Sequence, residues 1–336
     1  MKIGIVGGGI AGLTAAYRLS QKGVDCVLFE KQSFTGGRID YCVSITTPDF
    51  QPRLYALERE LGLEEAEIPF LPSSIAMLAE KNFMGFEDFP KMVESLTPEE
   101  KNYYQKIMQD AMANSFDIDQ PSERLLELRQ ISFAAYLKDC PPQLMGMVIE
   151  PMMGFTFMFP LDLSKFSADY GLFQIRFGAE MGGGRANTFD ENVKMLTNIL
   201  EYKILDAGSK VCLSAEVKRV QKQGNGFEVY FEENGQDKTE HVDKVIFATP
   251  LSITKTIMPE LDLGDGIFYE KSKCIFVQGK LKTDRTVIMG VPFRNIANVR
   301  CLFVAYPNEH QVYPMDISRP VDFSVVYDDS GTAGIM

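Results

Sequence analysis

The pattern of hydrophobic and polar positions changes along the chain, and at the N-terminus it predicts strand, helix and strand. Ile3–Val6 is short, apolar and β-branched, as in a buried parallel strand. Leu13–Lys22 carries apolar residues at helical spacing, and Gly23 stands where a helix C-terminus favours glycine. Asp25–Glu30 alternates and ends in an acidic residue. Residues 1–30 therefore predict one complete βαβ unit.

A second pattern, rich in Met and Phe, extends from Glu64 to Ala179 and is mainly that of helices. Leu54–Gly62, just before it, predicts an amphipathic helix. Thr97–Met112 opens with threonine and proline, and a glutamate follows in the order of a capping box. Leu125–Leu137 predicts a further helix. We expect this segment to form a separate layer on the substrate side of the molecule.

The third pattern returns to short strands separated by turns. Thr188–Glu191 predicts a capping box for a helix that runs to about Leu205, and Asn234-Gly235 is a typical hairpin turn. The predicted strands are Lys210–Ser214, Glu216–Lys222, Phe227–Glu232, Lys244–Thr249, Lys273–Lys282, Thr286–Val291 and Val299–Tyr306.

The composition limits the class of protein. The 336 residues are enough for two domains or for one large α/β unit. The 46 acidic residues outnumber the 34 basic ones, which excludes a nucleic-acid-binding protein because phosphates are bound by Lys and Arg. The six cysteines are far apart and only two histidines are present, so we predict neither a metal site nor a disulfide framework.

The N-terminus and the apolar runs predict a cytoplasmic protein. Met1-Lys2 leads directly into the first apolar run, without the three-part pattern of a secretory signal. The longest candidate for a membrane span, Pro142–Pro160, is interrupted by Glu150 and Pro151. We therefore expect no transmembrane segment, whereas peripheral contact with a membrane and the oligomeric state stay open.

The turn between the first strand and the first helix has the spacing Gly-x-Gly-x-x-Gly, followed about 20 residues later by an acid. The first glycine allows the tight turn, the second lets a pyrophosphate approach the backbone, and the third lets helix and strand pack closely. The helix N-terminus offers unpaired N–H groups to phosphates, and the acid accepts hydrogen bonds from ribose hydroxyls. We predict that a dinucleotide binds to Gly7, Gly9, Ala11, Gly12 and Glu30.

A second glycine doublet, Gly36-Gly37-Arg38, follows the acid-ended strand, and an NAD-binding domain has no need of it. In this feature the N-terminus resembles the FAD-dependent amine oxidase superfamily, which includes monoamine oxidases, protoporphyrinogen oxidases and phytoene desaturase-like enzymes. The resemblance implies FAD as cofactor. It also implies that the doublet and its arginine contact the flavin nucleotide from the side opposite the first turn.

The resemblance extends more faintly along most of the chain. The stretch LSAEVKRVQKQGNGFEVYF is similar to a strand pair of the family, and implies that Val217 meets the adenine through its backbone. Asp243–Pro250 resembles the family's second nucleotide-domain strand, which ends at a proline near the flavin. Gly182–Leu196 resembles a glycine loop and helix that approach the isoalloxazine ring.

One further match implies a catalytic residue. The stretch KSKCIFVQGK resembles the strand that in amine oxidases carries a lysine close to flavin N5, and Lys273 is the matching position. In the family this lysine holds a water molecule and assists reoxidation of the flavin by oxygen. Burial near a flavin would lower the pKa of a lysine. A lysine in a strand is more often a solvated edge residue, so both interpretations stay open.

The sequence departs from the family at two places. The segment IDYCVSITTPDFQPR is shorter than the corresponding hairpin of the family. Family members close with a segment like LYFAGD, which grips the flavin pyrophosphate and pyrimidine, whereas this sequence ends at VVYDDSGTAGIM without one. Either the chain is a fragment of a longer protein, or the fold has lost part of its flavin site.

The stretch LMGMVIEPMMGFTFMF has two interpretations. Methionine and aromatic side chains make adaptable pocket walls, which would suit a lipophilic substrate such as a polyene or tetrapyrrole. They are also typical of the buried core of a helical layer, and this interpretation is favoured.

Together these features predict an α/β protein with a Rossmann-like FAD-binding domain and a discontinuous, mixed α+β substrate domain. The FAD-binding domain comprises residues 1–60 and 182–250, and the substrate domain comprises 61–181 and 251–336. The predicted function is dehydrogenation of a small or lipophilic molecule at a C–N or C–C bond by hydride transfer to flavin N5. Alternatives are a flavin-dependent isomerase and a non-catalytic flavin-binding protein, and an NAD-dependent dehydrogenase comes last.

Overall fold

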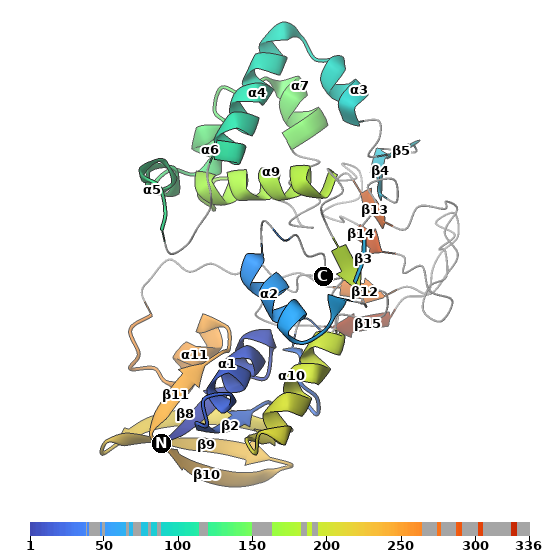
Figure 1. Cartoon of the computed structure of the whole chain (residues 1–336). Coiled ribbons are helices and arrows are strands. Elements are labelled where there is room, and N and C mark those ends of the chain that lie inside the picture. The colour runs from blue at the N-terminus through green and yellow to red at the C-terminus, as the bar shows by residue number, and fades with distance from the viewer. Residues whose placement is uncertain are drawn as a thin grey trace.

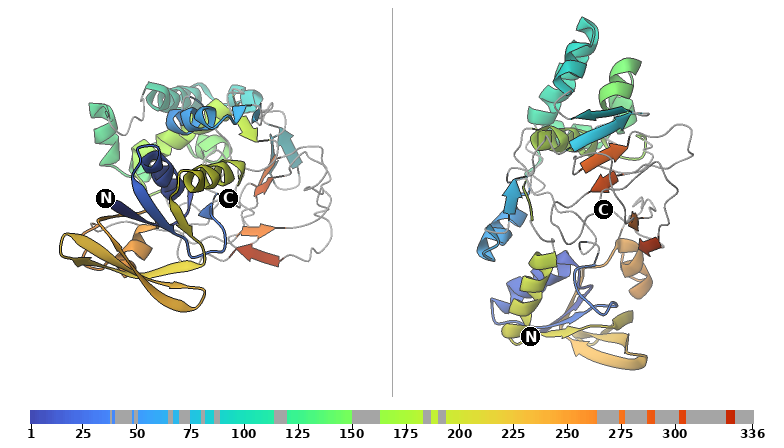
Figure 2. Two further views of the ribbon diagram at one scale, coloured as in Figure 1. Left: turned by 60° about the horizontal axis from the view of Figure 1, so that its bottom comes forward. Right: turned by 90° about the vertical axis from the view of Figure 1, so that its right-hand side faces the viewer.

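The fold was analysed in a computed structural model of the 336-residue chain. The structure describes residues 1–37, 39, 48, 51–64, 67–69, 75–79, 82–85, 89–113, 120–149, 163–182, 187–189, 194–263, 274–276, 287–290, 302–304 and 324–327. A region of strands lies at the bottom of Figure 1 and a group of helices at the top. The side view in Figure 2 shows the same separation.

A parallel sheet forms the centre of the lower region. Its strand order is β11-β1-β2-β7, and each neighbouring pair is parallel. The strands are β1 (Lys2–Val6), β2 (Asp25–Phe29), β7 (Lys210–Cys212) and β11 (Lys244–Phe247). Helix α1 (Ile10–Ser20) connects β1 to β2, so the predicted βαβ unit is confirmed. The α/β class predicted from the sequence is therefore confirmed.

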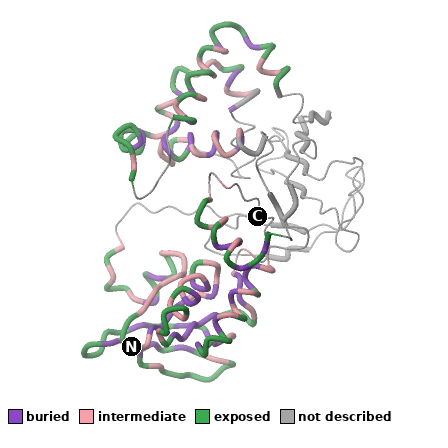
Figure 3. The backbone as a smooth tube through the Cα atoms, in the orientation of Figure 1, coloured by how far each residue is buried: buried purple, intermediate pink, exposed green. Residues whose placement is uncertain are grey.

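Two helices cover one face of this sheet. α1 lies beside α10 (Lys194–Asp206), and Figure 2 shows the two helices next to each other over the strands. Their buried side chains share one apolar cluster with the sheet, which includes Leu13, Ala16, Leu196, Leu200 and Ile204. Figure 3 shows how buried residues concentrate in the strands and on the inner sides of these helices. Burial on both sides explains why β1 and β2 are almost entirely apolar.

An antiparallel sheet packs against the other face. Its order is β10-β9-β8, formed by β8 (Ala215–Gln223), β9 (Gly226–Glu233) and β10 (Gln236–Val242). The turn at Asn234-Gly235 has φ values of 52° and 78°, which confirms the predicted hairpin. β10 is absent from the sequence-based expectation because its residues before Val242 are polar and only its pairing with β9 makes it a strand.

The helical region packs around a second apolar core. Its elements are α3 (Phe89–Glu94), α4 (Pro98–Ala113), α5 (Glu123–Arg129), α6 (Phe133–Tyr136), α7 (Pro142–Leu144), the π-helix Met145–Ile149 and α9 (Ala168–Gly182). The predicted capping box of α4 is confirmed. The Thr97 N–H donates to Glu100 Oε2 at 2.8 Å, and the Glu100 N–H donates to Thr97 Oγ1 at 3.3 Å.

The prediction of one helix over Leu125–Leu137 is wrong, because the segment forms α5 and α6 with a break between them. Ser132 adopts an extended conformation with ψ 154°, and its hydroxyl accepts a hydrogen bond from the Ala135 N–H at 3.1 Å. Serine side chains compete for backbone groups in this way, so a serine can start a new helix within an amphipathic pattern.

The expectation of a mainly helical segment from Glu64 to Ala179 is also wrong in part. Its N-terminal section contains the strands β3 (Glu67–Pro69), β4 (Ile75–Ala79) and β5 (Asn82–Gly85). β3 pairs with β6 (Asn187–Phe189). β4 pairs with β5 and with the distant β13 (Val287–Gly290), which itself pairs with β14 (Leu302–Val304). β12 (Cys274–Phe276) pairs with β15 (Ser324–Tyr327).

Thr188 lies in strand β6 and does not cap a helix, so the capping box predicted at Thr188–Glu191 is wrong. α10 begins six residues later, at Lys194. The remaining helices are α2 (Pro52–Glu60) and α11 (Leu251–Ile257). Within the part of the chain that the structure describes, no helix combines the length and the apolar character required to cross a membrane.

Candidate functional site: a dinucleotide-binding turn

Two glycines of the turn between β1 and α1, Gly7 and Gly12, could not carry a side chain without clashes. Gly7 has φ +105°, and a Cβ on Gly7 would lie 2.9 Å from the Ala248 carbonyl oxygen. A Cβ on Gly12 would lie 1.9 Å from the Gly7 carbonyl oxygen. Both obstacles are backbone atoms of the parallel sheet or of the turn itself. The close approach of helix and strand predicted for this motif is therefore confirmed.

Gly9 faces open space by comparison. Among the described residues, the one atom within 4 Å of a Cβ built on Gly9 is the Gly36 carbonyl oxygen, at 4.0 Å. Gly9 is thus a glycine that neither the turn nor its neighbours require for packing. Space beside the backbone at this position is what a pyrophosphate group would need.

Within the part of the chain that the structure describes, no side chain caps the N-terminus of α1. Gly9 is its N-cap and offers no capping side chain, and the first turn of the helix contains no acidic residue. The first bond within the helix runs from the Leu13 N–H to the Gly9 carbonyl at 2.9 Å. The backbone N–H groups of Ile10, Ala11 and Gly12 precede this bond, and Ala11 is exposed. They give this end of the helix the partial positive charge that phosphates prefer.

Glu30 follows β2 and lies beside the turn, with 6% of its surface exposed. Its Oε2 accepts a hydrogen bond from the Gly8 N–H at 2.7 Å, and its Oε1 accepts one from the Gln32 N–H at 2.9 Å. A Cβ on Gly8 would lie 2.9 Å from the Glu30 Cβ. The carboxylate is therefore held in one orientation, and each oxygen retains a lone pair for a ribose hydroxyl.

The second glycine doublet lies directly against the first turn. The Gly36 N–H donates to the Gly8 carbonyl oxygen at 2.9 Å, and Gly36 forms a parallel bridge with Gly9. Gly37 has φ +57°, and a Cβ on it would lie 3.3 Å from the Gly9 Cα. The structure thus brings together two glycine segments that the sequence separates by more than twenty residues. Arg38 lies outside the described residues.

Val217 lies on β8, close to the acidic residue. The Ala215 N–H donates to the Glu30 carbonyl oxygen at 2.8 Å, so Val217 is two residues along the strand from this contact. The pairing of β8 with β9 shifts register between Val217 and Arg219. Val217 itself is paired with Phe231, and Lys218, the next residue, has no partner in the ladder, so the ladder is interrupted directly after Val217. The Val217 side chain is buried in the apolar cluster beneath.

Some predicted site features are not described by the structure. Lys273 lies outside the described residues, as do most of Gly182–Leu196 and residues 150–159 of the Met- and Phe-rich stretch. In the described part of that stretch, Leu144 and Ile149 are fully buried and Met145 packs against them in the helical core. For these residues the core interpretation is confirmed.

The described residues offer little other chemistry. They contain no group of three or more His, Cys, Asp or Glu side chains that could hold a metal ion. The cysteines that can be assessed, Cys26, Cys140 and Cys212, are free thiols. Burial raises the pKa of each of these thiols, most strongly that of Cys140, to about 11, so they are poor nucleophiles.

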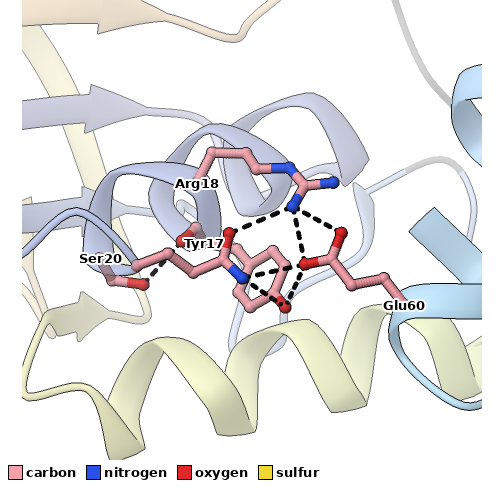
Figure 4. A network of polar contacts seen from close by, with 5 residues as sticks. Tyr17, Arg18, Ser20 and Glu60 are labelled. Atoms are coloured by element: carbon pink, nitrogen blue, oxygen red, sulfur yellow. Dashed lines mark hydrogen bonds and ion pairs between the residues drawn. The ribbon is translucent and has the colours of Figure 1, made fainter. Parts of the chain in front are cut away.

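Helix α2 is fastened to α1 by a polar cluster shown in Figure 4. Glu60 Oε1 accepts hydrogen bonds from Arg18 Nη1 at 2.7 Å, from the Tyr17 hydroxyl at 2.8 Å and from Gln21 Nε2 at 2.9 Å. These bonds, with that of Arg18 the strongest influence, lower the pKa of Glu60 to about 2. The cluster sits at the C-terminal end of α1, away from the glycine turn.

Sequence reasoning missed the contacts between α10 and the two residues that precede the second doublet. The Thr35 hydroxyl donates to Glu201 Oε2 on α10 at 2.5 Å. The Lys194 ammonium lies 4.9 Å from the centroid of the Phe34 ring. Nothing in a single sequence links residues that are 166 positions apart.

Comparison with protein families gives two matches. Residues 5–56 match the model of an NAD(P)-binding Rossmann-like domain. Residues 43–273, more than half of the chain, match the model described as flavin containing amine oxidoreductase. Among curated protein sequences, none matches the chain.

Three solved structures have the same fold, and each of them aligns with 86% or 87% of this chain. A protein from Pyrococcus furiosus has 18% identity and a TM-score of 0.61, over 87% of this chain and 72% of that one. A CLA-producing fatty acid isomerase from P. acnes has 16% identity and a TM-score of 0.62, over 86% and 68%.

A putrescine oxidase bound to putrescine has 17% identity and a TM-score of 0.62, over 86% of this chain and 70% of that one. At these identities the likeness shows the shared fold. The family match adds the cofactor, because the family is described as flavin containing. The chain therefore belongs to the flavin containing amine oxidoreductase family and is an FAD-dependent oxidoreductase.

Proposed function

We propose that FAD binds with its pyrophosphate between Gly9 and the N-terminus of α1, and with its adenosine ribose on Glu30. The observation that carries this proposal is the open space at Gly9, between two glycine segments that are otherwise tightly packed. The free N–H groups of α1 would neutralise the phosphates, and the backbone at Val217 would meet the adenine. Gly36, Gly37 and Arg38 would contact the nucleotide from the opposite side.

Each of these residues has a distinct task in the proposal. The glycine turn supplies space and the helix supplies partial positive charge, so together they determine affinity for the pyrophosphate. Glu30 is already oriented by the Gly8 and Gln32 N–H groups, so it can accept ribose hydroxyl hydrogen bonds without reorganising. Gly36, which forms a parallel bridge with Gly9, would cover the phosphates on that side.

The proposed reaction is oxidation of a small or lipophilic substrate at a C–N or C–C bond. Bound FAD supplies the acceptor for the hydride at N5. Residues 61–181 and 251–336 would form the substrate domain, and residues 1–60 and 182–250 the cofactor domain. Lys273 would hold a water molecule near the flavin and so assist its reoxidation. We further propose that the protein acts in the cytoplasm.

The first experiment records the visible absorption spectrum of the purified protein and identifies the nucleotide released on denaturation. A flavin spectrum with FAD released is the expected result. A colourless protein that cannot be reconstituted with added FAD would overturn the proposal. Anaerobic mixing with candidate amines and lipophilic alkenes would then show bleaching of the flavin, whereas product formed without any acceptor would identify an isomerase instead.

Two variants test the assignment of the site. Gly9→Val fills the open space beside the backbone and is expected to abolish FAD binding, because the side chain occupies the position of the pyrophosphate. Glu30→Ala is expected to weaken binding by about tenfold, the effect of lost hydrogen bonds from hydroxyls to a charged group. Equilibrium titration of the apoprotein with FAD measures both. Full flavin occupancy in Gly9→Val would show that the turn is not a phosphate site.

A further inference from the structure

The segment before the second glycine doublet is anchored to a helix far away in the sequence. Thr35 is 2% exposed, and its hydroxyl donates to Glu201 Oε2 on α10 at 2.5 Å. This distance is at the short limit for a hydroxyl bonded to a carboxylate, and bonds of this charged type are about twice as strong as bonds between neutral groups. The bond is also partly buried, so water competes for it less than at the surface.

The neighbouring residue is held by the same helix. The Lys194 ammonium lies 4.9 Å from the centre of the Phe34 ring, within the range of a cation–π contact. Lys194 and Glu201 are seven residues apart, so they lie on one side of α10, two turns from each other. One polar side of α10 therefore contacts two consecutive residues of the segment.

α10 is itself fixed relative to the phosphate-binding turn. Leu196, Leu200 and Ile204 are fully buried in the cluster that α10 shares with α1. The two glycine segments are therefore connected in two ways. Gly36 contacts Gly9 directly, and Thr35 is bonded to Glu201 on α10, which packs against α1, the helix that begins after Gly9.

The doublet needs such an anchor because it has little to hold it by itself. Gly36 and Gly37 have φ values of 114° and 57°, and glycine loses more conformational freedom on ordering than any other residue. Neither has a side chain to bury. Among the described residues, the hydrogen bonds of the doublet are those of Gly36, whose N–H donates to the Gly8 carbonyl at 2.9 Å and whose carbonyl accepts from the Ile39 N–H at 3.2 Å.

We propose that Thr35 and Glu201 are a positioning pair that holds the Gly36-Gly37 turn against Gly9 and thereby sets the affinity for FAD. This inference rests on the proposed FAD site. Neither residue would touch the cofactor. Their contribution would be to order the doublet before FAD binds, so that binding does not have to supply that entropy cost.

The test compares Thr35→Val with Thr35→Ser in the full chain. Valine keeps the shape of threonine but removes the hydroxyl, and we expect the Kd for FAD to rise about tenfold, the effect of losing one bond to a charged group. Serine retains the hydroxyl and should restore the wild-type Kd. The apoprotein is titrated with FAD, and binding is monitored by the quenching of flavin fluorescence. The melting temperature of the apoprotein is measured as well.

Thr197→Val is the matched control. Thr197 lies on the same helix, is fully buried, and donates its hydroxyl to the Lys194 carbonyl within α10 at 3.0 Å. Its loss should lower the melting temperature without changing the Kd for FAD. If Thr35→Val behaved in the same way, the pair would be merely structural and the inference would be overturned.

Glu201→Ala and the double variant complete the design. If the two residues act through one bond, the double variant should bind FAD no more weakly than either single variant, because contacting residues are not additive. Additive losses would contradict the pairing. Glu201→Ala also tests the bond if Thr35→Val does not fold. Failure of the wild-type protein to bind FAD would instead refute the proposed function, and is measured before any variant.

Discussion

The glycine turn and the helical region both depend on a glycine that lies too close to a neighbour for any side chain, but the neighbours differ. A Cβ on Gly12 would lie 1.9 Å from a backbone oxygen of the turn. A Cβ on Gly171, in α9, would lie 2.4 Å from the ring of Phe133. The first contact shapes the proposed FAD site from the backbone, and the second joins two helices by side-chain packing. Replacing each of these glycines by alanine therefore tests which region affects FAD binding and which affects only the stability of the fold.

The largest effect is expected at Gly12. Gly12→Ala forces a methyl group into the Gly7 carbonyl, which cannot move without disturbing β1, so the turn must open. We expect loss of measurable FAD binding and a destabilisation of about 3 kcal/mol, the upper end for overpacking. FAD titration and thermal melting measure the two quantities. Unchanged FAD affinity in this variant would mean that the turn does not bind the phosphates.

Gly171→Ala is the counterpart in the helical region. The methyl group meets the fully buried Phe133 ring, which can shift only by displacing its neighbours, so we expect destabilisation of about 2 kcal/mol. The Kd for FAD should not change. Thermal melting and FAD titration again give both values. A weakened affinity for FAD would show that the two regions are coupled and would break the comparison.

Gly146→Ala is a control for both substitutions, since a Cβ at this position would meet no described atom within 4 Å. Because alanine favours the helix more than glycine does, the melting temperature should stay the same or rise slightly, and the Kd for FAD should not change.

The smallest effect on stability is expected from the hydrogen bonds and the ion pair of Glu60, which join α2 to α1. The folded state lowers the pKa of Glu60 from 4.5 to about 2, so its bonds stabilise the protein above pH 4.5 and are lost as the pH falls towards 2. Because the Glu60 side chain is 35% exposed, solvent screening limits this contribution to about 0.5–1 kcal/mol.

Glu60→Gln should therefore lower the melting temperature slightly at pH 7, and the difference from wild type should disappear near pH 2. Melting curves between these pH values are the measurement. A difference that persists at low pH would mean that packing of the side chain, rather than its charge, fastens α2.

How much the sequence predicts differs between the two regions for a physical reason. In the nucleotide-binding region the strands, α1 and the glycine spacing are local features. Each follows from residues that are close together in the chain, and the structure confirms them. In the helical region, the capping box of α4 was predicted for the same reason, since its partners are three residues apart.

The features that could not be predicted depend on distant partners. β10 is polar along most of its length and is a strand because β9 supplies its hydrogen bonds. The helix predicted over Leu125–Leu137 breaks at Ser132, where the Phe133 N–H bonds to the Phe166 carbonyl at 2.9 Å. β6 occupies the predicted cap at Thr188 because it pairs with β3, more than a hundred residues earlier.

The sequence by itself determined the βαβ unit, the glycine turn and the acidic residue after β2, because periodicity and the steric freedom of glycine act over a few residues. The tertiary structure alone decided that Gly36 lies against Gly9, and that Thr35 is anchored to Glu201 on α10. These contacts join segments whose separation along the chain carries no information about their distance in space. They form only when the packing of α1, α10 and the sheet has brought the segments together.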